Sequence, residues 1–270
     1  MRGVADLLLL ELLVSTVIWV TVIVNGAEVS YRIRKASSVN ELLNTCIDGR
    51  NHKSKPGPEA SLFGHCLPWK HRSCCTEDVA KGLALDRSWL NFDWHHCGEL
   101  SPSCAQHFVK DLCFYECSPN LGPWIVPDKR KIRNERMVGV PLCQSACSSW
   151  WQDCKHDLTC LDNWAEDFDW STGINTCPAG KPCKKFENIF GSAQRFCEGL
   201  WNNSFKVVSD EEDCFRLWFS ADDPNPNDAI ARRHAEKLLG QSGTASSIAD
   251  LRKMIIFSMA LYVVSFFLIL

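Results

Sequence analysis

The chain has 270 residues, a formal net charge of −3, 46% hydrophobic residues, 16 cysteines and 11 tryptophans. It has no basic patch and no stripe that mixes aromatic with basic side chains, so the sequence gives no support for nucleic-acid binding. No zinc-protease helix, nucleophile elbow, phosphate loop or dinucleotide fingerprint occurs, so we expect neither an enzyme nor a bound cofactor.

The first 26 residues are predicted to be a signal peptide. Arg2 precedes an apolar stretch from Leu12 to Val24, which has the length of a signal-peptide core and is short for a membrane span. Val24 and Gly26 suit a cleavage site before Ala27. An uncleaved signal anchor is the alternative interpretation.

Helix signals begin soon after this segment. Ser38, with Glu41 three residues later, forms a capping-box pattern and predicts a helix start. Ser101 as the N-cap and Pro102 at the first helical position predict a helix over SPSCAQHFVKDLCFYEC. Together these patterns predict a chain with substantial helix.

A second helix of the same form is expected in VPLCQSACSSWWQDC, with Pro141 near its start. A last helix is expected over NPNDAIARRHAEKLLG, ended by Gly240. We expect loops and short strands pinned by disulfides in the rest, including 48–95 and 160–215. The sequence shows no convincing boundary between domains.

The last 28 residues, 243–270, are predicted to be a removed signal for a glycosylphosphatidylinositol (GPI) lipid anchor. Small residues come first, then a polar spacer ending at Lys253, then an apolar tail from Met254 to Leu270. We expect the lipid to be attached at Ser242, which leaves residues 27–242 as one domain. A true membrane span is the alternative, although no residues follow the tail to anchor its far side.

All 16 cysteines lie between Cys46 and Cys214. An even number in an exported chain predicts a disulfide framework of up to eight bridges. On a helix, cysteines four residues apart are too far from each other to bridge, so such pairs should join their helix to other segments. Zinc binding by these cysteines is the alternative, and it conflicts with an oxidising compartment; we expect no metal site.

Three other features have ordinary explanations. His95 and His96 precede Cys97, but a Cys–His nucleophile would need a free thiol, so we expect a structural role. The acidic run 210–213 does not have the spacing of a calcium loop and is expected to be a solvated turn. The abundance of tryptophan suggests that some of them line a pocket for a flat ring system, and the candidates are Trp69, Trp89, Trp94, Trp124, Trp150, Trp151, Trp164, Trp170, Trp201 and Trp218. Trp150 and Trp151 are expected instead to be core and surface partners on one helix.

The stretch HFVKDLCFYECSPNLGPWI strongly resembles the folate receptor family. The motifs ELLNTC, HKSKPGPE, CLPW, WHHCGELSPSC, ERMVGVPLC, WWQDC and WFSADDPNPN follow the same family pattern in the same order. The resemblance extends from about Glu41 to Ala229. The egg adhesion protein Juno and riboflavin-binding proteins are more distant branches of the same superfamily.

This resemblance implies a single globular α+β domain, in which several helices and short strands surround a deep, open ligand pocket. It also implies eight disulfides. Their pairing would be Cys46–Cys74, Cys66–Cys113, Cys75–Cys117, Cys97–Cys183, Cys104–Cys154, Cys143–Cys214, Cys147–Cys197 and Cys160–Cys177.

The resemblance also implies a pterin-binding set. Asp111 matches the aspartate that binds the pterin, and Tyr115 matches the ring that stacks on it. A carboxylate suits the amino and N–H groups of a pterin, and guanidinium groups suit its carbonyl and ring nitrogens. The remaining matching positions are Arg133, Arg136, Trp201, Ser204, Trp170 and Phe92. We expect arginines beside Asp111 to lower its pKa, which would make it a poor sensor near pH 5–6.

The positions that hold the glutamate tail of folate depart from the family. The loop HKGWNW is here AEDFDW, so Ala165, Glu166 and Phe168 replace histidine, lysine and tryptophan. Ile132 replaces a tryptophan, and Leu90 and Phe205 replace tyrosines. These changes predict a pocket that still recognises a pterin head and binds the tail less tightly.

The implied function is a GPI-anchored receptor on the outer face of the plasma membrane, which binds folate or a related pterin and passes through endocytic vesicles. A Juno-like adhesion receptor with an idle pocket and a protein partner on another cell is one alternative. A carrier of another heterocycle, such as riboflavin, is the other. Asn202 begins the only glycosylation sequon, although Ser204 of that sequon is also a proposed pocket residue.

Overall fold

The computed structural model describes residues 36–85 and 89–240. The predicted signal peptide, the lipid-anchor signal and Ser242 lie outside these residues. Within the described part of the chain, no helix is long and apolar enough to cross a membrane.

The fold mixes helices with short strands. The α-helices are α2 (Val39–Leu43), α3 (Glu77–Leu85), α4 (Pro102–Cys117), α5 (Gln144–Cys154), α6 (Phe186–Phe190) and α7 (Ala193–Gly199), and residues 227–240 are also helical. The 3-10 helices are η1 (Gly64–Trp69), η2 (Trp89–Asn91) and η3 (Gly122–Trp124). The strands are β1 (Ile125–Arg130), β2 (Arg133–Met137), β3 (Val140–Cys143), β4 (Leu158–Thr159), β5 (Lys184–Lys185) and β6 (Phe205–Val208).

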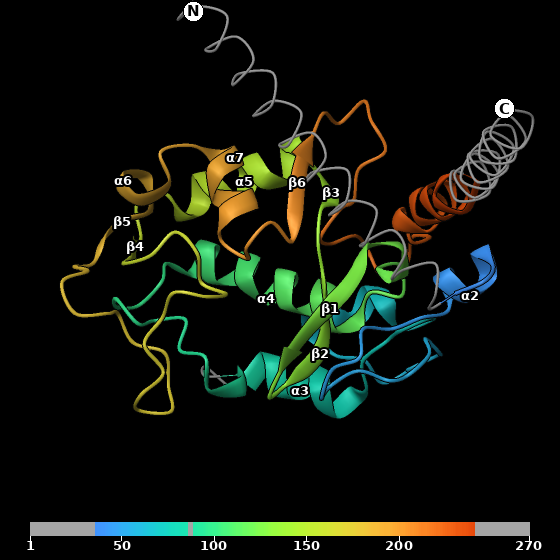
Figure 1. Cartoon of the computed structure of the whole chain (residues 1–270), viewed down its shortest axis with the longest axis horizontal. Coiled ribbons are helices and arrows are strands. Elements are labelled where there is room, and N and C mark those ends of the chain that lie inside the picture. The colour runs from blue at the N-terminus through green and yellow to red at the C-terminus, as the bar shows by residue number, and fades with distance from the viewer. Residues whose placement is uncertain (1–35, 86–88, 241–270) are drawn as a thin grey trace, which may run out of the picture.

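Helix α4 crosses the middle of the molecule (Figure 1). Helices α5 and α7 and the β3–β6 pair lie on one side of it, and α3 and the β1–β2 hairpin lie on the other (Figure 1). The predicted start of α4 is confirmed, because the Ser101 hydroxyl accepts a hydrogen bond from the Cys104 amide and Pro102 occupies the first turn. The helix ends at Cys117, where Ser118 becomes extended ahead of Pro119.

The strands form three two-stranded sheets within the described residues, rather than one large sheet. Strands β1 and β2 form an antiparallel hairpin, β3 and β6 pair in parallel, and β4 and β5 pair antiparallel. Small separate sheets leave much of the core to be built from helices and aromatic side chains. Trp69, Trp150 and Trp164 are among its largest fully buried members.

Two expectations about the secondary structure are wrong. Pro141 lies in strand β3, beside Lys206 of β6, and helix α5 begins only at Gln144. The amide of Ser145, in the first turn of α5, donates to the Asp210 carboxylate at 2.8 Å, so part of the acidic run caps this helix from a distant segment. The ranges 48–95 and 160–215 contain α3, α6 and α7 as well as loops.

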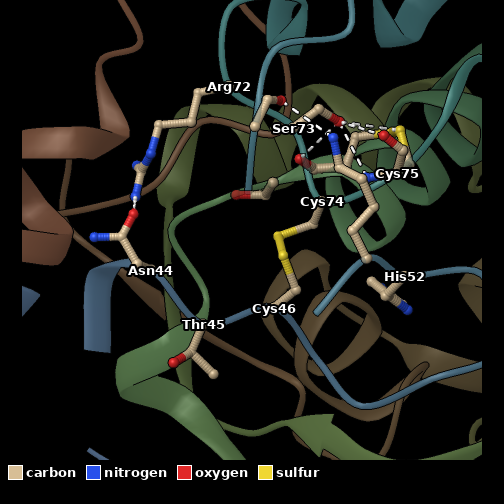
Figure 2. The surroundings of a disulfide bond; sticks show 12 residues. Asn44, Thr45, Cys46, His52, Arg72, Ser73, Cys74 and Cys75 are labelled. Atoms are coloured by element: carbon tan, nitrogen blue, oxygen red, sulfur yellow. Dashed lines mark hydrogen bonds between the residues drawn. A yellow bond between two sulfur atoms is a disulfide. The ribbon is translucent and has the colours of Figure 1, made fainter. Parts of the chain in front are cut away.

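The eight disulfides have the pairing that the resemblance implies. Figure 2 shows Cys74 joined to Cys46, while the adjacent Cys75 bonds to Cys117 of α4. Among the described residues, no disulfide joins two cysteines that are four residues apart in the sequence. The cluster of His96, Cys97, Cys160 and Cys177 has all its sulfurs in disulfides, which removes the thiolates that zinc would need.

The segment after α4 forms a rigid bracket between that helix and the hairpin. Gly122 lies so close to α2 that an added Cβ would sit 1.9 Å from the Leu42 carbonyl oxygen. Trp124 is buried, and its ring stacks on His234 at a centroid distance of 4.3 Å. This segment leads into β1 and so fixes where the β1–β2 hairpin meets α4.

Candidate ligand-binding site

A cavity of about 550 Å³ lies between α4, η2, the β1–β2 hairpin and the loop that follows Cys160. This volume falls in the range of small-molecule binding sites. Its lining is mostly apolar and aromatic. The lining residues are Trp89, Leu90, Asn91, Phe92, Trp94, Asp111, Leu112, Tyr115, Glu116, Arg130, Lys131, Ile132, Arg133, Met137, Trp164, Ala165, Trp170, Gly173, Trp201 and Ser204.

Asp111 is the buried carboxylate of this cavity, with 3% of its surface exposed. Its Oδ2 accepts a hydrogen bond from the indole Nε1 of Trp201 at 2.8 Å. Its Oδ1 is buried and has no hydrogen-bond partner in the described structure. A buried acceptor without a partner is unfavourable, so this oxygen is suited to receive a donor from a ligand.

Burial raises the pKa of Asp111 to about 7, and the hydrogen bond from Trp201 opposes this rise. The expected lowering of its pKa by arginines is therefore wrong. Arg133 is directed elsewhere, since its Nε donates to Asp128 at 2.8 Å and its Nη1 to the Tyr115 hydroxyl at 3.4 Å. A group that titrates near neutral pH responds to acidification, contrary to the expectation that Asp111 would be a poor sensor.

Tyr115 lies one turn after Asp111 on the same face of α4. Burial raises the pKa of its hydroxyl to about 12, so the group stays neutral at physiological pH. Behind it, the Nε2 of His52 donates a hydrogen bond to the Tyr115 carbonyl oxygen at 3.1 Å, and the His52 ring packs edge-on against the Tyr115 ring. The neighbouring Glu116 also lines the cavity, and its Oε1 accepts from Trp89 at 3.4 Å. These contacts hold the Tyr115 ring in place from behind.

Phe92 is the centre of the aromatic wall. Its ring centroid lies 5.8 Å from Trp201 and 6.1 Å from Trp170. Trp170 is 44% exposed and marks the rim of the cavity, whereas the Ser204 hydroxyl is buried and donates to the Trp201 carbonyl oxygen at 2.8 Å. Rigid aromatic walls of this kind suit a flat ring system.

Seven of the eight proposed ligand-binding residues line this cavity, and Arg136 does not. Its Nη1 donates to the carbonyl oxygens of Asn202, at 2.9 Å, and Trp201, at 3.5 Å. Because side chains alternate along a strand, Arg133 and Met137 face the cavity while Arg136 lies on the other side of β2. The structure thus places Arg136 behind the loop that carries Trp201.

Five of the six altered positions fall into two groups, and the sixth, Glu166, is exposed and does not line the cavity. Leu90, Ile132 and Ala165 line the cavity, so their replacements change its wall directly. Phe168 and Phe205 are buried in the core instead, where Phe168 packs against Phe92 and Phe205 against Phe114.

Sequence reasoning did not single out Glu116, Arg130 or Lys131 as site residues, although all three line the cavity. Glu116 follows Tyr115 directly and carried no separate signal. The run KRK at 129–131 was a detectable signal, because three consecutive cations next to a predicted pocket residue merit attention. His96 has the structural role expected of it, since its ring contacts Thr159 at 3.1 Å and packs on Trp164.

The fold and cavity define a disulfide-stabilised binding protein with a deep aromatic pocket for a small molecule. The profile of the folate receptor family matches residues 45–216. Over 206 residues the chain is 45% identical to folate receptor gamma of Homo sapiens, covering 75% of this chain and 84% of that relative. It is 42% identical to folate receptor alpha of Bos taurus (73% and 83% covered) and 34% identical to the riboflavin-binding protein of Dromaius novaehollandiae (64% and 71% covered). The chain belongs to the folate receptor family.

Proposed function

We propose that this protein is a GPI-anchored receptor on the outer face of the plasma membrane, which binds folate or a related pterin and carries it into endocytic vesicles. The observation that supports the ligand most directly is the buried, unpartnered Oδ1 of Asp111 within an aromatic cavity. A pterin offers an amino group and a ring N–H on one edge, which suits a carboxylate with one oxygen still free.

The proposal has a second part, which concerns the tail of the ligand. The pocket recognises the pterin head and binds the glutamate tail weakly, because Ala165 and Glu166 stand at the mouth in place of a histidine and a lysine. Ile132 and Leu90 contribute less aromatic surface to the wall. The anchor and the uptake rest on the terminal segments of the sequence, together with the membership of the family.

The first experiment measures the binding of folic acid to wild type and to Asp111→Ala by calorimetry. Both proteins are the mature forms that the expressing cell produces from the full-length chain. We expect Asp111→Ala to lose at least about 100-fold in affinity, because two charge-assisted hydrogen bonds disappear. Asp162→Asn is the control, since it removes the charge of an exposed carboxylate outside the cavity. Unchanged binding by Asp111→Ala would refute the assignment of the pterin site.

The tail is tested by comparing folic acid with pteroic acid, which lacks the glutamate. We expect the two affinities to differ by less than about tenfold. A strong preference for folic acid would contradict the proposal that the pocket binds the glutamate tail weakly.

A different heterocycle is the second candidate, because a relative at 34% identity is named a riboflavin-binding protein. Mass spectrometry of small molecules that co-purify with the chain decides between the ligands. A flavin in place of a pterin would favour this candidate, and a chain that binds neither would favour adhesion to a protein on another cell.

A further inference from the structure

The mouth of the cavity carries cations on the β1–β2 hairpin. Arg130, Lys131 and Arg133 line the cavity from this side. The loop that faces them contributes Ala165, Trp170 and Gly173 to the lining, none of which is charged. Positive charge at the mouth therefore comes from the hairpin and not from the opposite loop.

Arg130 is fully occupied by contacts within the protein. Its Nε donates to both carboxylate oxygens of Asp128, at 3.0 and 3.1 Å. Its Nη1 donates to the Ala165 carbonyl oxygen at 2.8 Å, and its Nη2 forms an ion pair with Glu166. Arg130 thus connects the hairpin to the facing loop, and two carboxylates balance its charge.

Glu166 is held in this position from a second side. Its Oε1 accepts a hydrogen bond from the Asn202 side-chain amide at 3.1 Å. Asp128 is likewise shared, because the Nε of Arg133 donates to it at 2.8 Å. Glu166 is therefore an exposed anion, held in place by Asn202, that occupies the guanidinium of Arg130.

Lys131 differs from its neighbour. It is exposed and lines the cavity, and no carboxylate among the described residues pairs with it. A lysine has a flexible stem and three donors, so it can follow a mobile anion at a solvated mouth. Lys131 is the cation at the mouth that remains available to a ligand.

We propose that the turn of the β1–β2 hairpin is an anion subsite, in which Lys131 binds a carboxylate of the ligand and Glu166 competes with that carboxylate for Arg130. The ligand class is a flat heterocycle with hydrogen-bond donors at its buried end and a carboxylate at its outer end. This proposal rests on the proposed function, because it takes the heterocycle to lie against Asp111. It also gives a specific cause for the weak binding of the glutamate tail, which is the neutralisation of Arg130 by Glu166.

The polarity of the cavity supports this orientation. Asp111 is 3% exposed, and a ligand carboxylate placed beside it would be buried next to a second acidic group, where a negative charge is costly. The exposed Lys131 lies at the open side, where an anion keeps part of its hydration. A ligand with one donor-rich end and one anionic end therefore fits in one direction only.

The test uses calorimetry at low salt with two probes, folic acid and 6-hydroxymethylpterin, which has no carboxylate. Lys131→Glu should weaken folic acid by about tenfold, since it replaces an attraction of about 0.7 kcal/mol with a repulsion of similar size. Lys129→Glu is the matched control. It makes the same change of charge at an exposed position of β1 that does not line the cavity, and it should change the affinity by less than about threefold. Neither variant should alter the binding of 6-hydroxymethylpterin.

A third variant, Glu166→Gln, tests the competition for Arg130. It removes the charge of Glu166 with little change in shape, and it should strengthen folic acid by about threefold without affecting 6-hydroxymethylpterin. Weaker binding of folic acid by Glu166→Gln would overturn the role of Glu166 as a competitor.

The outcomes separate this proposal from the function on which it rests. Equal effects of Lys131→Glu and Lys129→Glu on folic acid would overturn the subsite and leave the pterin receptor standing. A wild-type chain that binds neither probe would overturn both proposals. Thermal melting of each variant checks that its fold is intact, and the Glu166→Gln result still decides the proposal if one lysine variant is unstable.

Discussion

Asp111 is placed favourably for binding a ligand, although its burial is unfavourable in the protein without a ligand. One of its oxygens accepts a hydrogen bond from Trp201, and the other is buried without a partner. A buried carboxylate prefers its neutral form, which is why its pKa rises to about 7. A ligand with two donors would therefore relieve an unfavourable interaction at this buried carboxyl group.

The raised pKa predicts how stability depends on pH. The unfolded carboxyl has a pKa of about 3.8, so between pH 4 and pH 7 the unfolded chain has released a proton that the folded chain keeps. Rising pH therefore lowers the free energy of unfolding in this window by about 1.4 kcal/mol per pH unit through this group. The effect is complete above pH 7 and absent below about pH 4.

Asp111→Asn should remove this dependence. Between pH 5 and pH 8, we expect the free energy of unfolding of the variant to rise relative to that of wild type by about 2.5 kcal/mol. Urea denaturation of both proteins at the two pH values, without ligand and with disulfides intact, measures this margin. Asp162→Asn should run parallel to wild type. A parallel course for Asp111→Asn as well would show that Asp111 does not keep its proton in the folded chain.

At the scale of elements, the segment between α4 and β1, which includes η3, fixes the position of the β1–β2 hairpin relative to α4. Gly122 in η3 has an unusually close neighbour, because its Cα faces the backbone carbonyl of Leu42 in α2. A backbone oxygen cannot rotate away as a side chain can. Any side chain at position 122 must therefore push α2 away from η3.

Gly122→Ala should lower the free energy of unfolding by about 2–4 kcal/mol, because its Cβ would lie 1.9 Å from the Leu42 oxygen. Gly57→Ala is the control. There the nearest atom to an added Cβ is the mobile Nζ of Lys53, at 3.7 Å, so a change below about 0.5 kcal/mol is expected. Urea denaturation compares the two variants. Equal stabilities would show that α2 yields to the added methyl group.

The elements that sequence could predict are those with local signals. Ser101 and Pro102 set the start of α4, and Ser38 caps α2 by accepting from the Glu41 amide at 3.2 Å. Pro141 gave a false helix start, because Pro suits a first helical turn as well as a short strand whose N–H is not needed. Only the parallel pairing of β3 with β6, over 60 residues later in the chain, decides between them.

The same limit applies to the site. The aromatic and acidic types at positions 92, 111, 115 and 201 could be predicted from the family resemblance, and positions 111 and 115 also lie within one long motif. The pKa of Asp111 could not be predicted, because it depends on how deeply folding buries this carboxyl group and on its hydrogen bond with Trp201, 90 residues away in the chain. The contacts of Arg130 with Ala165 and Glu166 also join segments 35 and 36 residues apart. Such contacts arise only once the chain has folded.

At the scale of the whole molecule, different disulfides should contribute mainly to the stability of the fold or mainly to the order of the pocket. The Cys160–Cys177 bridge closes a loop with a sequence separation of 17, and this loop carries Trp164, Ala165, Trp170 and Gly173 of the cavity lining. The Cys143–Cys214 bridge has a separation of 71 and neither of its cysteines lines the cavity. The two bridges should therefore affect stability and binding in opposite order.

Two double variants test this division, each replacing both cysteines of one bridge by alanine. From the loop-closure entropy of the unfolded chain, losing the longer loop costs about 4.4 kcal/mol and losing the shorter one about 3 kcal/mol. Removal of Cys143–Cys214 should therefore destabilise the protein more, yet leave folic acid binding within about threefold of wild type while the chain is folded. Removal of Cys160–Cys177 should destabilise it less and weaken binding by about tenfold or more, because the loop must then be ordered when the ligand binds. Thermal melting and calorimetry on the same samples measure both quantities. If the variant with the lower stability were also the weaker binder, pocket order would simply follow overall stability, and the bridge across the pocket loop would have no separate role.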